Sequence, residues 1–254
     1  MRHAIVRTPG SELTGGERSF LDRIPIDFEL ALRQHQSYID SLTRLGCEVT
    51  VLPALDNFPD APFVEDMAIV LPDVAVITRT GAESRRGESA SVDQALQPHR
   101  SLVRMEAPAC LDGGDVFRVE GTLFVGQSTR TNHAGLKQLA HLVLEHGIRV
   151  KAVEVSECLH LRTACSWLGG NHMLVNPNWI RSDRLDGYDA IEVHPDERFA
   201  ATALVVGDVV LMSAACPRSI DRVREAGYEV LAQDISEFEK AEAGLTCLSL
   251  LFDE

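Results

Sequence analysis

The feature that most constrains the fold is a repeated unit whose last copy lacks one strand. Alternating apolar residues around short turns predict four β-hairpins. Their turns contain Gly, Pro, Asn or Asp, residue types that favour tight turns. The predicted hairpin strands are residues 67–71 with 74–78, 116–119 with 122–125, 165–168 with 172–175, and 202–206 with 209–213.

Between the hairpins lie helices and single strands. Apolar residues at helical spacing predict a helix over 28–45, with Asp27 as N-cap and Gly46 as its end. Similar patterns predict a helix over 136–144 that ends at Gly147, and a short helix around Ile220 and Val223. Further strands are predicted over 48–52, 101–105, 150–155, 190–193 and 228–231.

The final segment, residues 245–252, is predicted to be a strand that has no hairpin partner after it. Residues 3–7, at the other end of the chain, supply the missing strand. A unit of roughly 40–50 residues repeated five times, with one hairpin divided between the chain ends, predicts a closed ring. We therefore expect residues 1–254 to form one domain, a five-bladed α/β propeller of ββαβ units. An open α/β sheet of similar units is the alternative.

Charge and cysteine content limit the possible functions. With 24 basic and 38 acidic residues, the net charge of −14 argues against nucleic-acid or anionic-membrane surfaces and is compatible with a small cationic ligand. The N-terminus has no apolar signal region, and no apolar run is long enough to span a bilayer. The six cysteines form no Cys-x-x-Cys pair, which favours reduced thiols in a cytoplasmic protein.

Reactive residues occupy equivalent places in four of the five units, just before the predicted hairpins. In a fivefold ring these loops would point toward one axis and bring their side chains together. Only the unit that contains residues 199–201 has no titratable group there. The groups are Glu65 and Asp66, Asp112 and Asp115, His160, and Cys247.

Taken singly, each group has a simpler interpretation: Cys247 as an inert buried thiol, His160 as a core histidine, and residues 112–115 as a turn. Together they form a set suited to nucleophilic catalysis, in which an imidazolium stabilises a thiolate and a carboxylate orients the imidazole. Metal binding is the alternative. It is disfavoured because hard and soft ligands are mixed and no helical His-x-x-x-His spacing occurs.

Motifs along nearly the whole chain resemble the dimethylarginine dimethylaminohydrolase family of the pentein superfamily. They occur in the family's order, and the Phe-Val-Glu-Asp and Glu-Ser-Arg-Arg-Gly-Glu elements point to this family in particular. The segments are 58–60, 63–66, 78–88, Asp112-Gly113-Gly114-Asp115, 128–132, Leu159-His160-Leu161 and Leu245-Thr246-Cys247.

The resemblance implies a five-bladed fold and a cysteine-dependent hydrolysis of Nω-methylated arginines to citrulline and methylamine or dimethylamine. Cys247 would attack the guanidinium carbon and form a covalent thiouronium. His160 would protonate the departing amine and then activate water, and Asp112 would orient His160. Asp66 would bind the guanidinium nitrogens.

The resemblance also implies residues that place the rest of the substrate. Asp60 and the Glu65 region would hold its amino-acid end, and Arg85 and Arg130 its α-carboxylate. No cofactor and no metal would be needed, and no nucleic acid or membrane would be a partner. A homodimer is possible, because some relatives dimerise.

The chain departs from the family pattern around the substrate. Ala241 and Glu242 stand where the family has an apolar residue and Asp, and Glu17 or a neighbour replaces a Leu in a lid near residues 11–20. Another guanidine hydrolase of the same fold, acting on arginine or another N-substituted arginine, therefore remains an alternative. Non-enzymatic ribosome-associated proteins share the fold but have no need for the aligned Cys, His and carboxylates.

Overall fold

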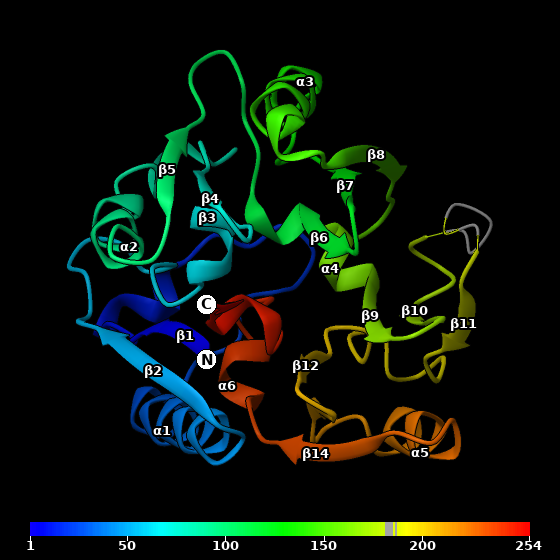
Figure 1. Cartoon of the computed structure of the whole chain (residues 1–254). Coiled ribbons are helices and arrows are strands. Elements are labelled where there is room, and N and C mark those ends of the chain that lie inside the picture. Colours follow the sequence, from blue (N-terminus) through cyan, green and yellow to red (C-terminus); the bar gives the residue numbers. More distant parts are fainter. Residues whose placement is uncertain (181–184, 186) are drawn as a thin grey trace.

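Five three-stranded sheets surround a central axis in the computed structural model, which describes residues 1–180, 185 and 187–254 (Figure 1). Each sheet joins an antiparallel hairpin to a third strand that runs parallel to the hairpin's second strand. The prediction of a five-bladed α/β propeller is confirmed. The blades are β15-β1-β2, β3-β4-β5, β6-β7-β8, β9-β10-β11 and β12-β13-β14.

The strands are short and their bounds lie close to the predicted ones. They are β1 (Arg2–Arg7), β2 (Cys47–Leu52), β3 (Ala68–Val70), β4 (Val74–Ile77), β5 (Ser101–Arg104), β6 (Val116–Val119), β7 (Thr122–Gln127), β8 (Arg149–Glu154), β9 (Cys165–Gly169), β10 (His172–Val175), β11 (Asp189–Glu192), β12 (Leu204–Val206), β13 (Val209–Ser213), β14 (Glu229–Gln233) and β15 (Leu250–Asp253).

The ring closes through its termini, as predicted. β1 pairs antiparallel with β15 and parallel with β2, so that His3 lies opposite Phe252 on one side and Glu48 on the other. An ion pair between Arg2 Nε and Asp253 Oδ1, at 2.9 Å, spans the same junction. The two chain ends therefore lie side by side near the centre of the ring (Figure 1).

The longer helices lie on the outer side of the ring and bury one face against the sheets, whereas the two four-residue helices, residues 161–164 and 236–239, lie nearer its axis (Figure 1). In the first helix the Asp27 side chain accepts a hydrogen bond from Leu30 N at 3.0 Å, the predicted N-cap. Burying a leucine such as Leu42 in this interface contributes roughly 1.5–3 kcal/mol. The helices are α1 (Phe28–Arg44), α2 (Ser89–Leu96), α3 (His133–Leu142), α4 (Leu161–Ala164), α5 (Pro217–Glu225) and α6 (Ser236–Glu239). None of them is long and apolar enough to cross a membrane.

Three helices, α2, α4 and α6, were not predicted from the sequence patterns. The residues before α2, at 83–88, have the composition of a solvated run of charges. In the structure they form a 3₁₀ turn, Glu83–Arg85, that carries Arg85 and Glu88 into the interior, where they are 4% and 1% exposed. Their opposite charges compensate each other, which is what allows both to be buried.

The prediction of one strand over residues 245–252 is wrong in its first half. Residues Thr246–Leu248 form a 3₁₀ turn, and β15 begins only at Leu250. Leu245 and Leu248 are both fully buried, and their spacing of three residues places them on one side of such a turn. The Tyr38 hydroxyl holds the turn by donating to Leu245 O at 3.1 Å. Cys247 is thus presented on a turn and not on a strand.

Candidate active site

A short turn precedes the first hairpin strand of four blades, and each turn carries a chemical group toward the axis. Asp66 lies in the turn Val64–Met67, and Asp112 precedes the turn Gly113–Asp115. His160 is the residue before α4, and Cys247 lies in Thr246–Leu248. The equivalent position of the remaining blade holds Ala200 and Ala201. The structure therefore brings together the groups that the repeat pattern placed at equivalent positions.

These groups surround a small cavity of about 30 Å³. This volume has room for water but not for an amino acid. Of the predicted site residues, Asp112 and Glu65 do not line it. The residues that do are Glu17, Asp60, Phe63, Asp66, Arg85, Arg130, Leu159, His160, Ala241, Glu242, Ala243 and Cys247.

Asp112 lies behind His160 and is completely buried. Its Oδ2 is 3.1 Å from His160 Nε2, and its Oδ1 accepts a hydrogen bond from Gly81 N at 2.7 Å. Asp66 Oδ1 also lies 3.9 Å from His160 Nε2. Two carboxylates therefore approach the same nitrogen of the imidazole.

Opposing effects act on the protonation of His160. Burial by itself lowers the pKa of the imidazole, but the charge of Asp66, the hydrogen bond to Asp112 and the charge of Asp115 more than offset this effect. The resulting pKa is about 9. His160 is therefore an imidazolium at neutral pH and has a proton to give.

The pKa of the Cys247 thiol is also raised, but for a different reason. Burial raises the pKa of its thiol, and the negative charges of Glu65 and Asp66 raise that pKa further. Two contacts act in the other direction: Gly244 N donates to Cys247 Sγ at 3.4 Å, and a hydrogen bond with the Thr246 side chain also lowers the pKa of the thiol. The thiol is thus protonated at neutral pH when no cation is bound beside it.

Asp66 is fixed by groups on both sides of its carboxylate. Gly114 N donates to Oδ1 at 2.9 Å, and Arg85 Nη1 donates to Oδ2 at 2.5 Å. Although burial opposes ionisation, the charges of His160 and Arg85 bring the pKa of Asp66 below its usual value. The site thus holds a permanent negative charge at this point.

Arg85 uses all of its nitrogens in these internal contacts. Besides Asp66, it donates to both carboxylate oxygens of Glu88 and to the carbonyls of Asp60 and Phe63. Glu88 was not among the predicted site residues. Its position at the end of the Glu-Ser-Arg-Arg-Gly-Glu motif, three residues after Arg85, could have indicated that it pairs with Arg85. The role of Arg85 in binding a substrate carboxylate stays a prediction.

The other predicted binding residues lie at different depths. Arg130 lines the cavity, and its Nη1 is 4.0 Å from Asp112 Oδ2. Asp60 also lines the cavity; it is buried and accepts a hydrogen bond from Glu17 N at 2.8 Å. Glu65 faces away from the cavity and pairs with Arg162 Nε at 2.9 Å.

The predicted lid near the N-terminus contributes Glu17 to the lining of this cavity. The Glu242 carboxylate accepts hydrogen bonds from the backbone N–H groups of Ser19, Phe20 and Leu21, at 2.5–3.0 Å. Arg18 Nε donates to Lys240 O at 3.1 Å. These contacts bind the predicted lid to the segment that contains Ala241, a few residues before the turn that carries Cys247.

Gly114 allows His160 and Asp66 to approach each other. A Cβ at this position would lie 2.7 Å from His160 Nδ1 and 2.8 Å from Asp66 Oδ1, closer than real Cβ atoms come. Behind this glycine, Asp115 accepts from Leu161 N at 3.0 Å and so fixes the start of α4 beside His160. Burial raises the pKa of Asp115 to about 6, although hydrogen bonds and the charge of His160 oppose this rise.

A metal ion is conceivable from ligand geometry, since single atoms of Asp66, Asp112 and His160 lie within 4.8 Å of one another. The protonation of His160 does not favour it, because the pKa of about 9 keeps the ring an imidazolium at neutral pH, and a metal needs the lone pair of a neutral imidazole.

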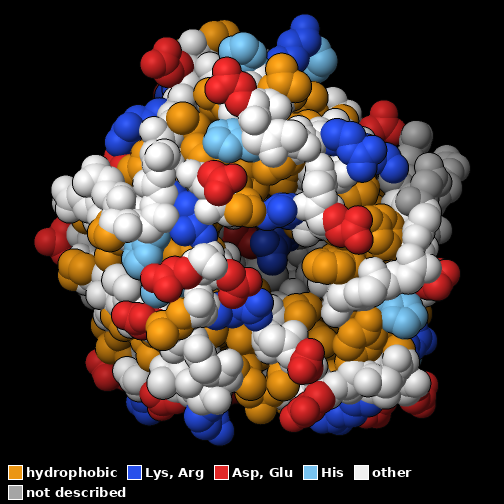
Figure 2. Space-filling model, in the orientation of Figure 1, with side chains coloured by type: hydrophobic (Ala, Val, Ile, Leu, Met, Phe, Trp, Pro, Cys, Tyr) orange, Lys and Arg blue, Asp and Glu red, His pale blue; other side chains and the backbone are white. Residues whose placement is uncertain are grey.

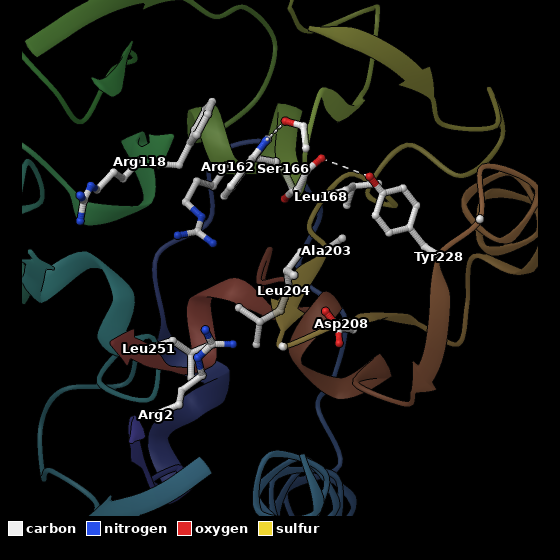
Figure 3. A pocket seen from close by; sticks show the side chains of 17 residues that line it. Arg2, Arg118, Arg162, Ser166, Leu168, Ala203, Leu204, Asp208, Tyr228 and Leu251 are labelled. Atoms are coloured by element: carbon white, nitrogen blue, oxygen red, sulfur yellow. Dashed lines mark hydrogen bonds between the residues drawn. The ribbon is translucent and has the colours of Figure 1, made fainter. Parts of the chain in front are cut away.

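A much larger cavity, about 640 Å³, lies at the hairpin-turn ends of the blades. The face in Figure 2 is hollowed near its centre, with basic side chains inside the hollow. Arg2, Arg118 and Arg162 are among the lining residues (Figure 3). Neither Cys247 nor His160 lines it, so we place the active site at the smaller cavity.

The Glu65–Arg162 pair connects the two regions. Arg162 lines the large cavity, and Thr246 Oγ1, from the residue before the nucleophile, donates to Glu65 Oε2 at 3.1 Å. Arg162 was not predicted, and a lone arginine after the Leu-His-Leu motif carries no signal in one sequence. Only the fold shows that it meets Glu65.

Comparisons with known proteins agree on one family. The model of the N,N dimethylarginine dimethylhydrolase family, eukaryotic, matches residues 19–208. The N(G),N(G)-dimethylarginine dimethylaminohydrolase of Pseudomonas aeruginosa is 34% identical over 253 residues and covers 99% of each chain. That of Streptomyces coelicolor is 37% identical over 254 residues, covering 100% of this chain and 98% of the relative.

A solved structure shows the same fold. The Pseudomonas aeruginosa enzyme, crystallised as a cysteine-to-serine variant in complex with citrulline, superposes with a TM-score of 0.95. It is 34% identical to this chain, and the match covers 98% of both chains.

Proposed function

The chain belongs to the dimethylarginine dimethylaminohydrolase family, and we propose that it hydrolyses Nω-methylated arginines with Cys247 as the nucleophile. One observation carries this proposal: a thiol, the His160–Asp112 pair and the Asp66 carboxylate meet at one cavity. A guanidinium carbon is an electrophile within a cation. A nucleophile beside fixed negative charge is therefore suited to attack it.

Binding and activation are linked in this proposal. The substrate guanidinium takes a charge-assisted contact with Asp66, whose carboxylate is ionised. The same positive charge offsets the negative charges of Glu65 and Asp66 that raise the pKa of Cys247. The thiol then loses its proton to solvent when the substrate is in place.

In the first chemical step, a C–S bond forms between Cys247 and the guanidinium carbon. The His160 imidazolium protonates the alkylated nitrogen, the C–N bond breaks, and methylamine or dimethylamine leaves. A thiouronium remains on Cys247. Because the imidazolium pKa is about 9, the proton for this step is present at neutral pH.

In the second step, neutral His160 removes a proton from water, and the oxygen attacks the thiouronium carbon. The second proton of that oxygen passes to the sulfur as the C–S bond breaks, citrulline leaves, and the thiol and imidazolium of the resting site are restored. One water is consumed in each cycle. Asp112 acts as a positioning residue that holds the imidazole throughout.

For the rest of the substrate we propose that Arg130 binds the α-carboxylate and Asp60 the amino group. Both line the cavity, and Arg130 has only a long contact of 4.0 Å to Asp112. Ala241, a small residue, leaves room for the alkyl groups on the guanidinium. A cavity of about 30 Å³ requires the lid to open before an arginine can enter.

The test is citrulline release from Nω,Nω-dimethylarginine, Nω-monomethylarginine and arginine, with Cys247→Ser as control. Turnover of the methylated pair, poor turnover of arginine and an inactive variant would support the proposal. Turnover of arginine alone would keep the mechanism and identify a different guanidine hydrolase. No turnover, together with an unreactive Cys247, would contradict the enzymatic role of this site.

We also propose that residues 1–254 act as one domain in the cytoplasm. Closure of the ring needs β1 and β15 together, and all six cysteines are free thiols, as in a reducing compartment. Deleting residues 1–7 should then abolish cooperative unfolding of the whole chain. Persistence of a cooperative transition would contradict the single domain.

A further inference from the structure

A second cluster of potential metal ligands lies where the ring closes, among residues that the proposed reaction does not use. His3 is on β1, His99 lies between α2 and β5, and Glu254 follows β15. One ligand atom from each lies within 4.8 Å of the other two. We propose that His3, His99 and Glu254 bind a divalent transition-metal ion, with Zn²⁺ as the best match.

The geometry of His3 is that of a ligand without its ion. The residue is 5% exposed, and its Nε2 is buried and makes no hydrogen bond to the described residues. A buried nitrogen without a hydrogen bond is costly unless the ring is protonated and pairs with Glu254, and a metal would use the lone pair of the neutral ring. Glu254 Oε1 lies 3.2 Å from this nitrogen, close to the ~3.4 Å expected between two ligands of a tetrahedral ion with bonds of about 2.1 Å.

The other ring nitrogen of His3 faces the carboxylate of Glu48, which is not itself one of the three proposed ligands. His3 Nδ1 is 3.8 Å from Glu48 Oε2, and the two residues are direct neighbours across the β1–β2 pair. A small rotation of the exposed Glu48 side chain would complete a hydrogen bond. Ligating histidines usually donate their second N–H to such a carboxylate, which fixes the tautomer with Nε2 free for the metal.

His99 is held beside His3 by its surroundings. The two ring centroids are 4.6 Å apart, and the Phe252 ring lies next to both, at 5.2–5.3 Å. The backbone of His99 is anchored, since its N–H donates to Leu96 O and Arg100 Nη1 donates to its carbonyl. Two imidazoles therefore converge on the Glu254 carboxylate with little freedom to move apart.

The donor set distinguishes among metals. Two imidazoles and one carboxylate suit Zn²⁺, with water as the fourth ligand, whereas Mg²⁺ and Ca²⁺ prefer oxygen ligands. The net charge of −14 also favours a cation.

A metal here would join both chain ends to the neighbouring blade, because His99 belongs to the β3-β4-β5 blade. We infer a structural role in closing the ring.

Binding is tested by calorimetric titration of the metal-free full chain with Zn²⁺. We expect one ion per chain, with affinity at least tenfold lower in His99→Ala and in Glu254→Gln. Glu48→Gln should weaken binding by about tenfold. Losing a group that hydrogen-bonds to a metal ligand typically lowers the metal affinity by about 10- to 100-fold, and this is the lower end of that range. His141→Ala, which removes an exposed histidine from α3, is the matched control and should bind as the wild type does.

The active site could also take up metal, so the ligand type must be identified. Co²⁺ bound by nitrogen and oxygen gives weak visible bands, whereas a thiolate ligand adds an intense near-ultraviolet band. We expect only the weak bands, unchanged in Cys247→Ser. At about 100 times the Kd, Zn²⁺ should raise the Tm by about 5 °C, and His99→Ala should lose this rise.

Three results would overturn the proposal. Equal affinity in wild type and His99→Ala would place the ion elsewhere. A thiolate band that disappears in Cys247→Ser would place it in the active site. If neither Zn²⁺ nor Co²⁺ binds, the three residues do not form a metal site, and His3 and Glu254 only form an ion pair. Each variant's Tm without metal shows whether it folds, and none of these outcomes depends on turnover.

Discussion

The buried carboxylate of Asp112 lies 3.1 Å from Nε2 of His160, and this contact helps keep a buried imidazole charged. Burial would favour the neutral ring, yet the carboxylates around it raise its pKa to about 9. The arrangement supplies an acid at neutral pH next to a thiol whose pKa is also raised. In the reaction that we propose, the positive charge of the substrate lowers the pKa of the Cys247 thiol and so produces the nucleophile.

Replacing Asp112 with Asn should lower the pKa of His160, because a hydrogen bond to the charged ring and a nearby negative charge are both lost. NMR titration of the imidazole measures this directly. We expect kcat at neutral pH to fall about 100-fold, as when a general acid is misplaced. Asp73→Asn, in an exposed turn, is the control. An unchanged His160 pKa would contradict the argument.

The same pKa makes a prediction for stability. The folded pKa of about 9 lies above the reference value of 6.5, so protonated His160 stabilises the folded state. This contribution is complete below pH 6.5 and is lost as pH rises through about 9. The destabilisation of Asp112→Asn, measured by urea unfolding, should therefore be larger at pH 6 than at pH 10. An equal loss at both values would exclude this linkage.

Glu65→Gln should lower the pKa of the Cys247 thiol, since after burial the Glu65 charge is the largest cause of its rise. Alkylation of Cys247 by iodoacetamide at pH 8, followed by mass spectrometry, should be several-fold faster. Glu83→Gln, at an exposed glutamate, is the control. Glu65 does not line the cavity, so a faster rate would not come from wider access. A slower rate would argue against the electrostatic account.

Gly114→Ala should abolish turnover, because the new Cβ would lie within 3 Å of both His160 and Asp66. We expect a loss of kcat of at least 100-fold, since the acid and the guanidinium-binding carboxylate must move apart. Gly121→Ala is a matched control, with nothing within 4 Å of its Cβ. Comparable activity in the two variants would show that the close approach is unimportant.

Arg85→Gln should destabilise the protein by about 3–5 kcal/mol, because it leaves the buried Asp66 and Glu88 carboxylates unpaired. The neighbouring Arg86→Gln removes a partly exposed pair with Glu83 and should cost at most about 1 kcal/mol. Urea unfolding compares the two variants. Normal stability of Arg85→Gln with a raised KM would instead support direct binding of the substrate carboxylate.

Glu242→Ala should loosen the lid, because three backbone N–H groups lose their acceptor. Trypsin should then cut more rapidly after Arg18 and Arg23, and KM should change while Cys247 stays reactive. Glu225→Ala, on α5, is the control. Equal rates of cleavage in wild type and Glu242→Ala would mean that other contacts hold the lid.

The sequence predicted most of the strands and the closure of the ring, because the patterns that mark them are local in the chain. Alternating apolar residues, glycine turns and the Asp27 cap act within a few residues of the chain, and they located the strands and the ring closure. Equivalent positions in a symmetric ring must face one axis. That geometric fact predicted the meeting of Asp66, Asp112, His160 and Cys247.

The tertiary structure alone decided where the remaining charges point. Nothing in the sequence separates buried Arg85 from its neighbour Arg86, or shows that Glu65 faces Arg162 instead of the cavity. The 3₁₀ turn under Cys247 likewise depends on Tyr38, which lies more than 200 residues away along the chain. Such outcomes depend on long-range packing and on charge compensation between distant segments, and these interactions exist only once the ring has closed.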